Sequence, residues 1–94
     1  MSGPHPGVVV QSDLLRRSST VVIVSMTSSA RAAAYSLPFI VAVSARESGL
    51  DRDGWAKCDQ PMTVPLNKLG PRLGRLSPDA LDRVDIALRF VLAI

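Results

Sequence analysis

The hydrophobic pattern of the chain changes once, near Ser77, and this change limits the folds that the chain can adopt. Before Ser77, apolar residues come in short runs rich in Val and Ile, separated by Gly, Pro, Ser and charged residues. Such runs predict β-strands, because β-branched side chains pack well on a pleated sheet. After Ser77 the apolar residues recur at helical spacing. We therefore expect a sheet of short strands followed by one C-terminal helix, as in an all-β or α+β barrel.

Five apolar runs are predicted to form the strands. They are Gly7–Gln11, Thr20–Met26, Pro38–Val43, Gly54–Cys58 and Met62–Val64. The second run is apolar nearly throughout, so we expect it at the centre of the sheet. Residues 1–7 are predicted to be an irregular lead-in because they hold two Pro and two Gly. The polar segments 12–19 and 44–54 are predicted to be exposed connections.

The C-terminal helix is predicted over residues 77–94. Ser77 can cap the first turn, Pro78 suits the first helical position, and Asp79 complements the helix dipole. The predicted core face comprises Leu81, Val84, Leu88, Val91 and Leu92. The apolar residues outside that face are Ile86, Phe90 and Ile94. These residues suggest that the helix also packs against something beyond its own sheet. The i,i+4 spacing predicts that Asp79 pairs with Arg83 and Asp85 with Arg89.

Composition excludes several classes of protein. Hydrophobic residues make up 47% and charged residues 20%, which excludes a disordered chain. Aromatic residues make up 4%, too few for a base-stacking platform. A single cysteine excludes an internal disulfide and a cysteine-built zinc site, and a single histidine excludes two-histidine metal motifs. No apolar segment is long enough to span a membrane. We therefore expect a soluble intracellular protein without a metal or cofactor.

The formal net charge of +3 is mild, but it is compatible with a polyanionic partner. Cys58 is expected to be a small buried hydrophobe, because no second histidine could activate it as a nucleophile. Trp55 suits either the core or a dimer contact, and nothing near it in the sequence decides between them.

Several segments carry a family resemblance in order along the chain. They are Pro6–Asp13, Thr20–Ser28, Gly49–Gly54, Asp59–Val64 and Leu69–Ser77, the last leading into the helix. Together they resemble the MazF/PemK family of bacterial toxins, over nearly the whole chain. The resemblance implies one toxin domain over residues 1–94, mainly β with a C-terminal helix. Its fold would be a small SH3-like barrel of the MazF/PemK/CcdB type.

The resemblance also implies an activity and partners. The family cuts single-stranded RNA at short sequences without a metal, acts as a homodimer in the bacterial cytoplasm, and is neutralised by a cognate antitoxin. Metal-free cleavage uses the neighbouring 2′-OH as nucleophile, so it needs proton transfer and stabilisation of the phosphorane charge. Two alternatives stay open: a toxin of the same fold class that poisons gyrase, and an inactive relative that only binds RNA or antitoxin.

The resemblance places the two catalytic roles of the family on Thr27 and His5. Thr27 matches the family threonine, although a threonine at a strand end also commonly satisfies a local turn. His5 stands where the family has arginine. Histidine can transfer protons near neutral pH but stabilises a phosphorane less well than a guanidinium. The alternative is that His5 is simply an exposed residue of the lead-in.

The predicted RNA-binding residues surround these two. They are Arg16, Arg17, Ser28, Ser29 and Arg31. The arginines would contact phosphates, with affinity that weakens with salt and without choosing sequence. Family members usually begin with one more strand and a long loop over the active site, whereas this chain starts at the second element. We therefore expect an exposed sheet edge and an RNA groove that lacks one wall.

Overall fold

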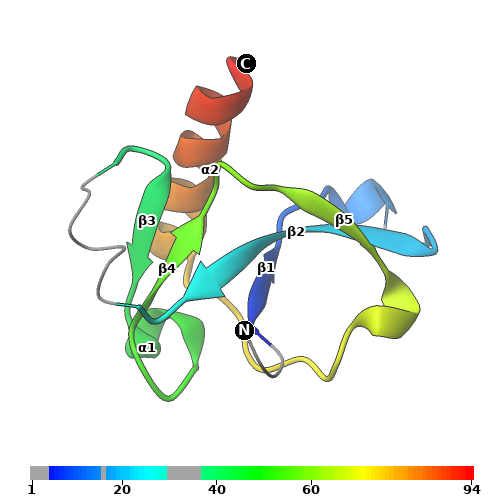
Figure 1. The fold of residues 1–94 in the computed structure, drawn as a ribbon, viewed down its shortest axis with the longest axis horizontal. Helices are drawn as coiled ribbons and strands as arrows, with labels where there is room; N and C mark the ends of the chain where they lie inside the picture. Colours follow the sequence, from blue (N-terminus) through cyan, green and yellow to red (C-terminus); the bar gives the residue numbers. More distant parts are fainter. Residues whose placement is uncertain (1–4, 16, 30–36) are drawn as a thin grey trace.

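The computed structural model describes residues 5–15, 17–29 and 37–94. The strands are β1 (Gly7–Val9), β2 (Thr20–Thr27), β3 (Ile40–Val43), β4 (Gly54–Lys57) and β5 (Met62–Pro65). The helices are α1 (Ala45–Ser48) and α2 (Pro78–Leu92), with short 3-10 turns at Asp13–Leu15 and Leu66–Lys68. The predicted order of five strands and a C-terminal helix is confirmed (Figure 1).

β2 organises the sheet, as its apolar sequence predicted. One edge of β2 pairs antiparallel with β1, and its other edge is shared between β5 and β4. The first half of β2 pairs with β5, and its last two residues pair with β4. β3 then pairs with β4, giving the strand order β1-β2-β4-β3 with β5 on β2. This arrangement is mainly antiparallel, with the C-terminal end of β2 enclosed between β1 and β4.

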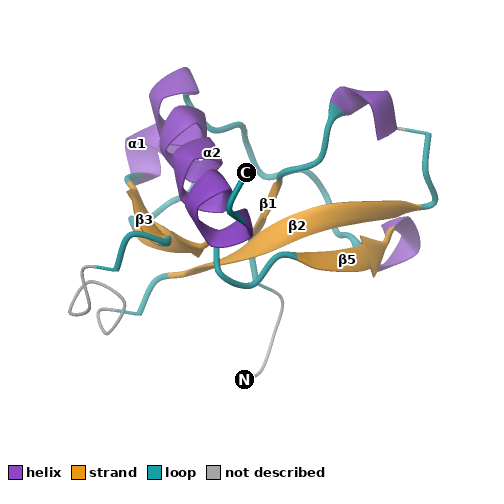
Figure 2. Cartoon of the chain, turned by 90° about the horizontal axis from the view of Figure 1, so that it is seen from above, coloured by secondary structure: helices purple, strands orange, loops and turns teal. Residues whose placement is uncertain are grey.

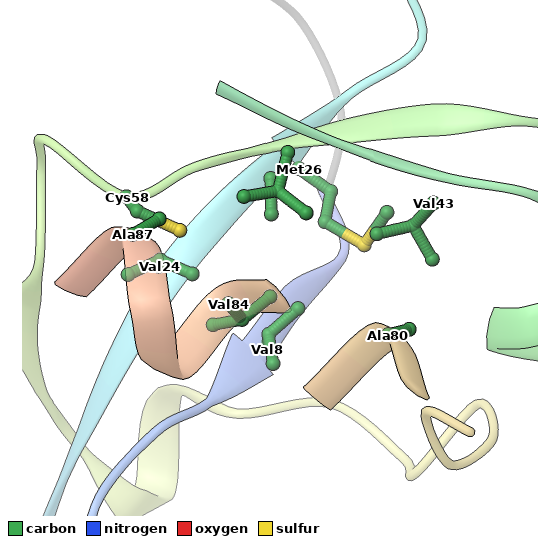
Figure 3. Packing of buried hydrophobic residues seen from close by; sticks show 10 residues of the cluster. Val8, Val24, Met26, Val43, Cys58, Ala80, Val84 and Ala87 are labelled. Atoms are coloured by element: carbon green, nitrogen blue, oxygen red, sulfur yellow. The ribbon is translucent and has the colours of Figure 1, made fainter. Parts of the chain in front are cut away.

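α2 covers one face of the sheet, and the core lies between them (Figure 2). The core consists of Val8, Val24, Met26, Val41, Val43, Ala56, Cys58, Ala80, Val84 and Ala87. Figure 3 shows Val84 and Ala87 of α2 turned toward Val8 and Val24 of the strands. Cys58 is fully buried, which confirms its predicted role as a small hydrophobe. We call the opposite side of the sheet, away from α2, the outer face.

The start of α2 is confirmed and its predicted core face is partly wrong. The Ser77 hydroxyl accepts from the Ala80 N–H at 3.2 Å, and Pro78 opens the helix. The residues that α2 buries are Ala80, Val84 and Ala87. Leu81 and Leu92 are 40% and 52% exposed, because the helix lies on the sheet with its smaller side chains. Ile86, Phe90 and Ile94 are exposed, as their position off the core face predicted.

The connection predicted over 44–54 contains the short helix α1. Its start is a capping box, in which Ser44 and Glu47 satisfy each other's backbone N–H groups. Gly49 ends it in a left-handed conformation with φ of 79°, which glycine adopts without strain. The predicted pairing of Arg83 with Asp79 is wrong: Arg83 instead bonds Glu47 of α1 at 2.7 Å. No helix in the described part of the chain has the length and apolarity needed to cross a membrane.

Candidate functional site

The pairing of β1 with β2 brings His5 and Thr27 to opposite positions. The register pairs Gly7 with Ser25 and Val8 with Val24. The Met26 N–H donates to the Pro6 carbonyl at 3.0 Å, so the ladder extends one residue before the start of β1. The next pair in this register is His5 with Thr27. Continued to this pair, the register would set the two predicted catalytic residues, 22 positions apart in the sequence, opposite each other.

The hydrogen-bonding pattern between β1 and β2 decides how close the side chains of such a pair would lie. Pairs that exchange backbone hydrogen bonds alternate with pairs that do not, and Pro6 with Met26 belongs to the bonded kind. His5 and Thr27 thus form a non-bonded pair, in which facing Cβ atoms lie about 4.5–5.5 Å apart. Both are on the outer face, because Val24 and Met26 alternate with Thr27 and point into the core. His5 is exposed and Thr27 half-buried, so RNA can reach this pair.

The Thr27 side chain already makes one local bond. Its Oγ1 accepts the backbone N–H of Ser29 at 3.1 Å, which is the turn that a threonine at a strand end commonly forms. A hydroxyl that accepts one bond still holds its hydrogen for donation. Thr27 is therefore held in place by the turn and can donate to a phosphate oxygen. The following residues, Ser28 and Ser29, are exposed at the same strand end.

Gly54 lets β4 approach Thr27 closely, and sequence analysis missed this. A Cβ atom built on Gly54 would lie 2.9 Å from the Thr27 carbonyl oxygen, closer than real Cβ atoms come to other atoms. Only glycine therefore permits the observed spacing of the two strands. The turn residues before β4 indicated a connection, but they gave no sign that the glycine itself contacts the candidate site.

The predicted arginines do not all join this site. Arg17 is exposed and lies just before β2, while Thr27 is the last residue of that eight-residue strand. At about 3.3 Å per residue, the strand separates its two ends by about 23 Å. The structure therefore holds Thr27, Ser28 and Ser29 together at one end of β2, which the continued register places opposite His5, and it leaves Arg17 at the far end of β2. Arg16 and Arg31 lie outside the described residues.

A hollow lies next to the site on the side of β4. It has a volume of about 380 Å³ and is lined by Ala42, Val43, Ser44, Glu47, Asp53, Gly54, Trp55 and Arg83. The Arg83 guanidinium donates through Nη2 to Glu47 Oε2 at 2.7 Å and to the Ala42 carbonyl at 3.2 Å. The hydrogen bond from Arg83, with a second from the Ser44 N–H, lowers the pKa of Glu47 below its ordinary value of 4.5.

The sequence matches a family of toxins, and the fold matches solved endoribonuclease and toxin structures. Residues 1–92 match a family described as PemK-like, MazF-like toxin of type II toxin-antitoxin system. The chain is similar to Endoribonuclease EndoA of Bacillus subtilis (strain 168), with 30% identity over 93 residues. That alignment covers 98% of this chain and 78% of the relative.

Two solved structures show the same fold. One is an endoribonuclease in complex with its cognate antitoxin from Mycobacterial species, with a TM-score of 0.84 and 26% identity over 98% of this chain and 84% of that one. The other is the Mycobacterium tuberculosis toxin MazF-mt6, with a TM-score of 0.81 and 22% identity. That match covers 96% of this chain and 87% of that chain, and it supports the fold alone.

Proposed function

The chain belongs to the PemK-like, MazF-like family of toxins of type II toxin-antitoxin systems, and from this premise we propose that it is an endoribonuclease that cuts single-stranded RNA without a metal. One observation of the structure supports this most. Continued one pair beyond Pro6 and Met26, the β1–β2 register would set His5 opposite Thr27 on an exposed face, where a phosphate can contact both, and this supports the proposal. The similarity to an endoribonuclease over 98% of the chain supports the same activity.

The proposed reaction is attack by the RNA's own 2′-hydroxyl on the adjacent phosphorus. The imidazole of His5 accepts the 2′-hydroxyl proton as the new P–O2′ bond forms. The Thr27 hydroxyl donates to a non-bridging phosphate oxygen, where negative charge grows in the phosphorane. The P–O5′ bond then breaks and the 5′-oxygen takes a proton from water. The products are a 2′,3′-cyclic phosphate and a 5′-hydroxyl.

We propose that the whole chain, residues 1–94, is one toxin domain that works as a homodimer in the bacterial cytoplasm. Its other partner would be a cognate antitoxin with an acidic, partly disordered tail that folds on binding. An acidic partner suits the segment before α2, where Lys68, Arg72 and Arg75 are exposed. The solved complex of an endoribonuclease of the same fold with its cognate antitoxin supports an antitoxin as the partner.

The direct test compares the wild-type protein with Thr27→Ala and His5→Ala on a long single-stranded RNA in EDTA. We expect discrete cuts with 5′-hydroxyl ends from the wild type, loss of cutting in Thr27→Ala, and strong impairment in His5→Ala. Full activity of His5→Ala would assign the proton transfer to another group.

The same experiment separates the alternatives. A protein that cuts no RNA but arrests growth, with relief by a resistant gyrase, would be a gyrase poison. A protein that neither cuts RNA nor arrests growth would be an inactive relative that binds RNA or antitoxin only.

A further inference from the structure

We propose that Trp55 and the hollow beside it form a subsite for a guanine base of the RNA, next to the phosphate held at Thr27. This inference rests on the proposed function, because it names how the same site would choose its RNA. Trp55 contributes a surface for stacking, Arg83 contributes hydrogen-bond donors, and Asp53 contributes an acceptor. None of these three residues belongs to the predicted catalytic pair.

Trp55 is placed by the sheet directly beside Thr27. The β2–β4 register pairs these two residues, so their side chains share the outer face about 5 Å apart. On its other side Trp55 pairs with Ala42 of β3, an exposed residue whose small side chain covers little of the indole. Trp55 is half-buried and lines the hollow. A base that follows the phosphate at Thr27 can therefore stack on the indole without a large movement of the chain.

Arg83 is held so that part of its guanidinium is available. Both of its hydrogen bonds within the described residues run through Nη2, to Glu47 and to the Ala42 carbonyl. The N–H groups of Nη1 and Nε thus carry no bond to those residues, and the side chain is 44% exposed. These bonds fix the plane of the guanidinium beforehand, so a single N–H group of Nη1 is already oriented for a ligand.

Asp53 supplies the complementary acceptor. Its Oδ1 accepts the Ala45 N–H at 2.7 Å, which fixes the carboxylate at the start of α1. Its Oδ2 has no hydrogen-bond donor among residues 5–15, 17–29 and 37–94. The other carboxylate of the hollow, Glu47, has both oxygens engaged, Oε1 by Ser44 and Oε2 by Arg83. Asp53 is therefore the acidic group of the hollow with an oxygen left for a base.

This set of groups matches guanine better than the other bases. Guanine presents the acceptor O6 to a single remaining N–H group of Arg83. It also carries N–H donors at N1 and N2 that a carboxylate can accept. The hollow, at about 380 Å³, falls in the range of small-ligand sites. Stacking on Trp55 would add about 5- to 150-fold to the affinity of the base.

The first experiment uses Trp55 as its own probe, because it is the only tryptophan of the chain. Thr27→Ala is titrated with fluorescently labelled single-stranded RNA that contains guanine, and with a matched RNA in which adenine replaces guanine. We expect indole emission to change with the guanine RNA, with the same midpoint as the anisotropy of the label. Binding seen by anisotropy with unchanged indole emission would overturn the subsite. Indole emission that changes with protein concentration but not with RNA would also overturn the subsite, because it would show that Trp55 lies in a dimer contact.

The second experiment reads base preference from cleavage of a randomised RNA. The wild type should select guanine at one fixed position beside the cut. Trp55→Phe should keep most of the rate, and Trp55→Leu should lose fivefold or more, because it fills the space without stacking. Arg83→Gln should lose the preference for guanine. Arg89→Gln, an exposed arginine of the same helix outside the hollow, is the matched control and should keep both rate and preference.

The outcomes separate this inference from the function on which it rests. Cleavage by the wild type, with base preference unchanged in folded Trp55→Leu and Arg83→Gln, would overturn the subsite and leave the nuclease intact. If Arg83 has a purely structural role, Arg83→Gln should lower the thermal midpoint of unfolding and leave the base preference unchanged. A wild-type protein that neither binds nor cuts RNA would contradict both proposals.

Discussion

Substitution of Gly54 by alanine should impair Thr27 through the backbone, without changing any polar group. The new Cβ atom would lie 2.9 Å from the Thr27 carbonyl oxygen, whereas ordinary contacts begin at 3.4 Å. The two strands must therefore separate by about half an ångström. A misplacement of about 1 Å can cost about 100-fold in rate, so we expect a loss of about tenfold in kcat/KM. The overpacking should also cost about 1–3 kcal/mol of stability.

The assay is the initial rate of RNA cleavage, measured well below the thermal midpoint of each variant. Gly70→Ala is the matched control, because no atom lies within 4 Å of a Cβ atom at that position. The control should keep the wild-type rate and stability. A folded Gly54→Ala protein that is less stable but cuts RNA at the wild-type rate would refute the reasoning. It would show that the position of Thr27 does not govern the chemistry.

Three further measurements test the fold around the site. Ser77→Ala removes the hydroxyl that caps α2 and should lower the free energy of unfolding by about 1 kcal/mol, measured by urea denaturation. Burial raises the pKa of the Cys58 thiol to about 11, so at pH 8 a disulfide reagent should label it slowly in the native protein and quickly in urea. Rapid native labelling would contradict the described core. The hydrogen bond from Arg83 lowers the pKa of Glu47 in the folded protein. The ionised Glu47 should therefore stabilise the protein at pH values above 4.5, its ordinary pKa, and this stabilisation should be lost as the pH falls through the lowered pKa of the folded state. The stability difference between wild type and Glu47→Gln should therefore shrink in acid, and a difference that is constant from pH 7 to pH 3 would contradict the bond to Arg83.

Local sequence signals predicted the elements of this fold well. β2 follows from an apolar run of β-branched residues, and the start of α2 follows from Ser77 and Pro78. α1 also had a signal, since Ser44 followed three residues later by Glu47 is the pattern of a capping box. That signal was missed because charged and turn-forming residues surround it.

Features that depend on distant parts of the chain could not be predicted in this way. Arg83 bonds Glu47, 36 residues away, in preference to Asp79 one turn before it, because the packing of α2 beside α1 decides its partner. The facing of His5 and Thr27 depends on the β1–β2 register and on one bond to the Pro6 carbonyl. The family resemblance identified both residues as catalytic candidates, but the sequence alone did not show that they would be neighbours.

The central claim is that the RNA's own 2′-hydroxyl attacks the phosphate that Thr27 contacts. The most direct measurement is cleavage in EDTA of two labelled RNA oligonucleotides that share one preferred cut site. They differ only in a 2′-deoxy sugar immediately 5′ of the scissile phosphate. We expect the all-RNA substrate to give a cyclic phosphate and a 5′-hydroxyl, and the deoxy substrate to stay intact at that site. Cleavage of the deoxy substrate at the same phosphate would contradict the mechanism.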